Sequence, residues 1–217
     1  HTSGSGAPTE NQGPGDGPRE FTIVLTGDGT ISVVDVGSEI EAWTFSVIPD
    51  LPPEIELVAG PERANGGGLR VGYRFKDDYG VVGGRGEIAL ATVTESAQPL
   101  VGAPDYILTI PRSEIRDGEA ATARDVSEHP WAGLDVDVTL IAADAAGQEG
   151  RSATHRATLP GRVFANPLAI ALVAERQKLA LDAHMAGAVA TALDQLASGP
   201  ARDAGLTGFL AIRSAYY

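Results

Sequence analysis

The 217-residue sequence contains no cysteine and no apolar run approaching 18 residues. The absence of cysteine excludes disulfides, thiol catalysis and cysteine-ligated zinc. Without a long apolar run, nothing in this sequence is expected to span a membrane. No nucleophile elbow, phosphate-binding loop or dinucleotide-binding glycine pattern is present, and no two histidines have the helical spacing of a zinc pair. We therefore expect a protein that is not an enzyme.

Positive charge is also scarce, and the formal net charge is −13. Because an acidic surface repels phosphate backbones, we expect no binding of nucleic acid. The imbalance lies almost entirely in residues 1–160, which carry 25 acidic and 11 basic side chains, a formal charge of −14. Residues 161–217 carry 4 acidic and 5 basic side chains, a charge of +1. This contrast predicts two units with different surfaces.

Residues 1–18 are rich in Gly, Ser and Pro and predict a flexible lead-in, because so few apolar groups cannot offset the entropy lost on ordering. From Phe21 to about residue 160, polar and apolar residues alternate in about nine short stretches separated by Gly, Pro and Asp turns. The pair Asp28-Gly29 predicts a hairpin turn between residues 21–25 and 30–34. This pattern favours a mainly β region over 19–160, an immunoglobulin-like antiparallel β-sandwich.

The stretch from residue 69 to residue 76 shows the alternation most clearly. Four apolar side chains fall on one face of the predicted strand and basic side chains on the other; the apolar ones are Leu69, Val71, Tyr73 and Phe75.

The period changes to that of a helix at Asn166, which suits an N-cap, and Pro167, which suits the first helical position. A helix of about thirty residues is predicted from here. It has a seam of apolar side chains repeating every seven residues, which includes Leu172, Leu179 and Leu193. A second helix is predicted from about residue 201 to Tyr217, so that 161–217 form a helical hairpin or a coiled-coil stem. Such a seam needs a partner: the second helix, further chain or another copy.

Four stretches resemble a known family: "WTFSVIPDLPPEIEL", "LRVGYRFKDDYGV", "HPWAGLDVDVTLIAADAAGQEG" and "LPGRVFANPLAIALVAERQKLAL". They are similar to the alphaproteobacterial DUF4175 family of envelope proteins. The resemblance covers roughly residues 19–217. It implies that this chain is a periplasmic part of an inner-membrane-anchored protein, which reaches the membrane only through segments outside this chain. It implies no reaction.

Two adjacent carboxylates, Asp77 and Asp78, follow the predicted strand and precede Tyr79 and several glycines. Neighbouring side chains on a strand point to opposite faces, so both can bind one ion only if the strand has ended. One interpretation is a calcium site, to which Asp144 could contribute oxygen atoms. The other is a turn capped by one of these carboxylates through backbone amides, with Tyr79 packed on the core. We favour the turn and expect no other cofactor.

The loop "HPWAGL" begins at His129 and contains Trp131. One interpretation is that this loop forms part of a pocket or a protrusion that binds a partner. The alternative is that Trp131 plugs the end of the sandwich and His129 bonds to the backbone, since large aromatic residues of β-sandwiches are mostly core.

The function that these features favour is a non-enzymatic structural or interaction module of a membrane-anchored envelope protein. Its seam would bind another envelope protein or a second copy of the chain. The alternative is a module that binds calcium or an envelope glycan through the Asp77–Asp78 turn and the loop from His129 to Trp131.

Overall fold

The computed structural model describes residues 2–3, 9–11, 20–25, 27–112 and 115–198. The chain divides into two compact units, His1–Asp50 and Leu51–Tyr217, and each has its own β-structure.

The first unit contains two small antiparallel sheets. One has the strand order β1-β4-β5 and the other pairs β2 with β3; their bounds are β1 (Thr2–Ser3), β2 (Thr9–Asn11), β3 (Glu20–Thr22), β4 (Gly29–Asp35) and β5 (Ser38–Phe45). The tight turn lies at Val36 and Gly37, whose φ angles are 44° and 85°. The predicted hairpin turn at Asp28-Gly29 is wrong, because β4 pairs with β5 and not with residues 21–25. Instead, the Asp28 carboxylate accepts hydrogen bonds from Ser46 Oγ (2.9 Å) and the Val47 backbone N–H (2.7 Å).

The division between the two units, at Asp50 and Leu51, falls inside the predicted β region of 19–160. Within the described residues, no strand before Asp50 pairs with the large sheet that follows Leu51. The segment between them contains Pro49, Pro52 and Pro53, which have no backbone N–H to donate to a ladder. Of the predicted flexible lead-in 1–18, the described residues form β1 and β2, and the others lie outside the described residues.

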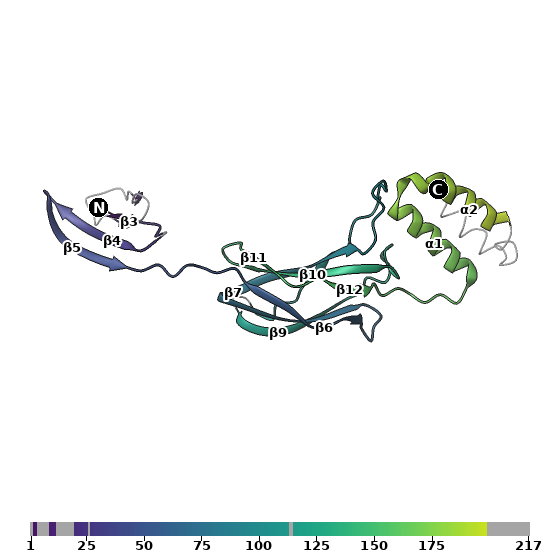
Figure 1. The fold of residues 1–217 in the computed structure, drawn as a ribbon, viewed down its shortest axis with the longest axis horizontal. Coiled ribbons are helices and arrows are strands. Elements are labelled where there is room, and N and C mark those ends of the chain that lie inside the picture. Colours follow the sequence, from purple (N-terminus) through teal and green to yellow (C-terminus); the bar gives the residue numbers. More distant parts are fainter. Residues whose placement is uncertain (1, 4–8, 12–19, 26, 113–114, 199–217) are drawn as a thin grey trace. The chain divides into compact units, whose positions relative to one another are not determined.

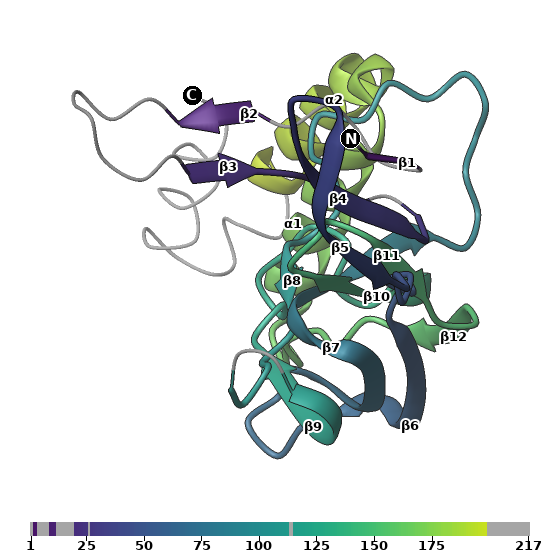
Figure 2. The ribbon, with the colours of Figure 1, turned by 90° about the vertical axis from the view of Figure 1, so that its left-hand side faces the viewer.

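The second unit is built on a seven-stranded antiparallel sheet. Its strands are β6 (Glu54–Arg63), β7 (Leu69–Leu90), β8 (Tyr106–Ile107), β9 (Ile115–Arg124), β10 (Asp135–Asp144), β11 (Glu149–Arg151) and β12 (His155–Thr158). The 22-residue strand β7 organises the sheet. Its first part, 69–76, lies between β6 and β9, and its second part, 81–90, between β10 and β8. Figure 2 shows the strong curvature of β6, β7 and β9.

This curvature brings β6 into contact with β10, β11 and β12, although none of these is its hydrogen-bonded neighbour. The core lies inside the curl. The predicted apolar face of the strand, Leu69, Val71, Tyr73 and Phe75, is buried there, together with Val136, Val138 and Leu140 of β10. On the opposite face, Arg74 pairs with Glu56 of β6 and Glu119 of β9. The prediction of a mainly β protein with antiparallel sheets and C-terminal helices is confirmed.

The predicted thirty-residue helix is wrong: residues 167–198 form two helices. They are α1 (Pro167–Leu181) and α2 (Ala186–Ser198), separated by the short 3₁₀ helix η1 (Ala183–Met185). Asn166 caps α1 as predicted, since its Oδ1 accepts a hydrogen bond from Leu168 N at 2.9 Å. The helix is interrupted at Asp182, whose backbone is extended (φ −152°). The Oδ1 atom of Asp182 accepts hydrogen bonds from His184 N (3.0 Å) and Gln98 N (3.2 Å).

The two helices contact one another (Figure 1). The second helix predicted for 201–217 lies outside the described residues. Within the described ranges, no helix has the length and apolar character needed to cross a membrane.

Candidate functional site

The corner at Asp77 interrupts the pairing of β7 without ending the strand. On β9, Asp117 pairs with Lys76 and Ile115 pairs with Val81, so several residues of β7 bulge out opposite one residue of β9. Asp77 Oδ2 accepts hydrogen bonds from the backbone N–H groups of Tyr79 (3.0 Å) and Gly80. Asp77 therefore caps the corner, as the turn interpretation predicts.

Two details of that interpretation are wrong. Strand β7 continues through the corner to Leu90 and changes partners there, although Gly80 within the bulge has a φ of 114°. Tyr79 does not pack on the core, since it is 50% exposed. The bulge removes Tyr79 from the regular alternation of sides along the strand.

The three candidate calcium ligands each bond to a separate backbone group. Asp78 Oδ1 accepts from Leu51 N (3.4 Å), and Asp144 Oδ1 accepts from Gln148 N (2.8 Å). Asp77 and Asp144 are only 6% and 4% exposed, and each keeps one buried oxygen without a hydrogen-bond partner, Asp77 Oδ1 and Asp144 Oδ2. In the part of the chain that the structure describes, no group of three His, Cys, Asp or Glu side chains is placed to hold a metal ion.

The loop from His129 to Trp131 has an inner and an outer part. Trp131 is 7% exposed and belongs to the core, as the core interpretation predicts. His129 Nδ1 accepts a hydrogen bond from Trp131 N (3.2 Å), and the two rings meet edge to face with centroids 5.6 Å apart. Burial, followed by the positive charge of Arg176, lowers the pKa of His129 below its usual value. His129 and Pro130 form the outer part of the loop.

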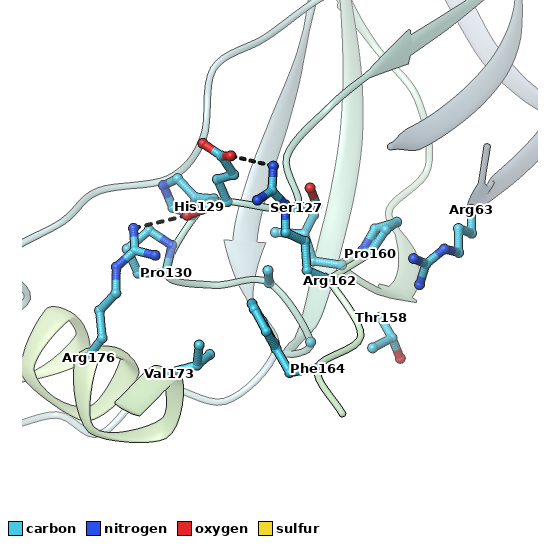
Figure 3. A pocket seen from close by; sticks show the side chains of 15 residues that line it. Arg63, Ser127, His129, Pro130, Thr158, Pro160, Arg162, Phe164, Val173 and Arg176 are labelled. Atoms are coloured by element: carbon cyan, nitrogen blue, oxygen red, sulfur yellow. Dashed lines mark hydrogen bonds and ion pairs between the residues drawn. The ribbon is translucent and has the colours of Figure 1, made fainter. Parts of the chain in front are cut away.

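A hollow of about 640 Å³ lies beside this loop, and we call it the arginine pocket. Its basic side chains come from three elements: Arg63 from the end of β6, Arg162 from the segment before α1, and Arg176 from α1. In Figure 3, Arg162 lies between Arg63 and Arg176. Glu128 bonds to two of these arginines. Its carboxylate pairs with Arg162, and its backbone carbonyl accepts a hydrogen bond from Arg176 Nη2 at 2.9 Å.

A second hollow of about 530 Å³ lies along α1 and α2, and we call it the leucine groove. It brings together the three predicted seam residues, Leu172 and Leu179 from α1 and Leu193 from α2. The three predicted seam residues therefore line one groove, although the helix predicted to carry them is broken. The rest of its lining is mostly apolar: Leu100, Val101, Pro130, Val173, Ala180 and Val189, with Glu175 and Arg176.

The two hollows share Pro130, Val173 and Arg176, so they adjoin at α1. The DUF4175 family, described as a domain of unknown function, matches the sequence over residues 1–217. The chain belongs to the DUF4175 family. The comparison with curated proteins found no match.

Several residues around the hollows of this DUF4175 domain were missed by sequence reasoning. Leu100 and Val101 lie in a loop, and their backbone N–H groups bond to the Ala180 carbonyl (3.0 and 3.3 Å). Arg63 and Arg162 lie nearly a hundred residues apart in sequence. Their only signal is that they are basic residues in an acidic chain. What the site offers chemically is an apolar surface beside concentrated positive charge, which suits binding.

Proposed function

We propose that this DUF4175 domain is a non-enzymatic interaction module in the periplasm, within a membrane-anchored protein of the cell envelope. Its docking surface is the leucine groove, and its occupant is an apolar, helix-forming segment of another envelope protein that carries acidic residues at one end. The observation that carries this proposal is the groove itself, in which side chains from both helices and the 100–101 loop leave an apolar hollow.

The composition of the groove supports a helical peptide as its occupant. Leu172, Leu179 and Leu193 are each only partly buried, so apolar area is left for a partner to cover. An amphipathic helix fills such a groove with side chains that repeat every three or four residues. Arg176 lies where the groove meets the arginine pocket, so an acidic end is complementary there.

Site-specific photo-crosslinking in the full-length protein, in its own envelope, tests this proposal. A photoreactive residue at Val173 should crosslink to one other protein, whereas the same residue at the exposed Ile170, outside the groove, should not. Mass spectrometry of the crosslinked peptide should identify an apolar, helix-forming segment with nearby acidic residues.

Two variants provide the matched control. Leu172→Gln places a polar group in the groove and should abolish the crosslink from Val173. Ile170→Gln, on the same helix but outside the groove, should leave it intact. A crosslink to a second copy of this chain, or one that survives Leu172→Gln, would contradict the proposed partner.

Calcium binding is the second candidate function, and one observation favours it. The unpartnered oxygens Asp77 Oδ1 and Asp144 Oδ2 are buried carboxylate atoms, and unpaired buried charge is costly.

Thermal melts with calcium and with EDTA provide the test. Asp77→Asn retains an oxygen acceptor for the turn and removes the charge, so it should eliminate a calcium-induced rise in Tm. An equal Tm with calcium and with EDTA in the wild type would exclude this role.

An envelope glycan has less support at the predicted loop. Trp131 is buried in the core, so it offers no ring face on which a sugar could stack.

The finer fold prediction, an immunoglobulin-like sandwich, belongs to the same proposal. The two parts of β7, each with its own neighbouring strands, resemble two packed layers, with one strand common to both.

A further inference from the structure

We propose that the arginine pocket is a binding site for a phosphate monoester group. The pocket shares Arg176 with the leucine groove, but the inference does not require that the groove be filled. It rests on local charge, on free hydrogen-bond donors and on the shape of the pocket.

The charge of the arginine pocket is opposite to that of the molecule. Three guanidinium groups and one carboxylate, that of Glu128, line it, which gives a local formal charge of +2 in a chain of net charge −13. Asp125 also feels this charge: hydrogen bonds from Ser127, and then the charge of Arg162, lower its pKa. A phosphate monoester carries a charge of about −2 near neutral pH and therefore matches the lining of the pocket.

Among the described residues, most of the N–H groups of the three arginines have no hydrogen-bond partner. Arg162 bonds to the carboxylate of Glu128, and Arg176 to the carbonyl of the same residue. No described residue forms an ion pair or a hydrogen bond with the guanidinium of Arg63. A guanidinium carries several donors in a planar fork, which matches two phosphate oxygens at once. Arginines from three elements line the pocket, with Arg162 between Arg63 and Arg176 (Figure 3).

The lining also fits an organic carrier for the phosphate. Phe164, Val173 and Pro130 give the pocket an apolar wall, and about 640 Å³ is within the range of sites for small ligands. The lowered pKa of His129, to which Arg176 contributes after burial, is consistent with positive charge acting on the groups nearby. His129 therefore stays neutral near pH 7 and does not need a counter-ion of its own.

Titrations followed by ¹H–¹⁵N NMR test the site in the whole chain at constant ionic strength, with sodium chloride as the balancing salt. Inorganic phosphate and glycerol 3-phosphate should each bind saturably and shift the backbone amides of 127–133 and 161–162. Succinate, a dianion with carboxylate groups, should bind at least about tenfold more weakly. Vesicles containing phosphatidic acid, compared with phosphatidylcholine alone, then distinguish a lipid headgroup from a soluble phosphomonoester, and binding to either source supports the site.

Arginine variants locate the binding. Arg63→Gln removes a guanidinium without a partner, so the fold should be unaffected, and Kd for glycerol 3-phosphate should rise by about tenfold. The control is Arg156→Gln, since Arg156 pairs with Asp137 on an exposed part of the sheet, outside the pocket. An unsaturable response, succinate binding as tight as phosphate, or equal losses in Arg63→Gln and Arg156→Gln would each overturn the proposal.

Discussion

His129 links the stability of the second unit to pH. Burial, and then the charge of Arg176, lower its pKa in the folded protein, so folding favours the neutral imidazole. The unfolded chain has a histidine pKa of about 6.5 and binds a proton more readily. Stability from this residue is therefore present above about pH 6.5 and is lost as the pH falls toward the lower folded-state value.

The first prediction follows from this difference. Between about pH 7.5 and 5.5, the wild type should lose more free energy of unfolding than His129→Asn, whose side-chain oxygen can still accept from Trp131 N. Urea unfolding at several pH values measures both curves. Parallel curves would show that His129 does not contribute to this pH dependence.

Val36 is strained in the turn between β4 and β5. A β-branched residue at positive φ is unfavourable, and this side chain is 99% exposed and gains nothing from burial. Both central residues of the turn have positive φ, the pattern of turns that favour Asn-Gly.

Val36→Asn should therefore stabilise this hairpin by about 1 kcal/mol. Hydrogen exchange should show slower exchange of the β4 and β5 amides in this variant. Val36→Ile, which keeps the β-branch, should show no such slowing, and equal protection in the two variants would contradict the strain argument.

At the scale of elements, the chain just before β6 approaches β11 closely. A Cβ atom added to Gly150 would lie 1.5 Å from the Pro53 carbonyl oxygen, so the backbone would have to move. Gly150→Ala should cost about 2–3 kcal/mol of stability. Gly83→Ala is a matched control, because no atom lies within 4 Å of its added Cβ. Chemical denaturation of both variants gives the comparison, and similar midpoints would show that the contact is not tight.

Sequence predicts the buried face of β7 well and the helix break poorly, for one physical reason. Alternation along a strand is local, so burial of Tyr73 and Phe75 can be read from neighbouring residues. The break at Asp182 depends partly on Gln98, which is 84 residues distant. No local signal separates an exposed Asp on a continuous helix from one that caps a new turn.

The same distinction holds for the candidate site. The seam predicts Leu172, Leu179 and Leu193, because they repeat along one stretch of chain. The arginine pocket could not be predicted, since the fold alone brings together Arg63, Arg162 and Arg176. The Asp77 turn was predictable because the bonded amides belong to the next residues along the chain.

At the scale of the whole molecule, we predict that the protein is a monomer in solution. A net charge of −13 opposes close approach of two copies, and the proposed partner of the leucine groove is a different protein. Light scattering should give a mass near 22.4 kDa at both low and high salt. A species of about twice that mass, lost in Leu172→Gln, would instead identify self-association through the groove.

The length of β7 also determines when the second unit can fold. Its second part pairs with β10, about fifty residues further along the chain, and β12 then pairs with β10. Loops of this length close slowly, so a chain that emerges from its N-terminus has no closed core until Thr158 has been made. During synthesis the second unit therefore stays without a closed core until almost all of its strands have been made.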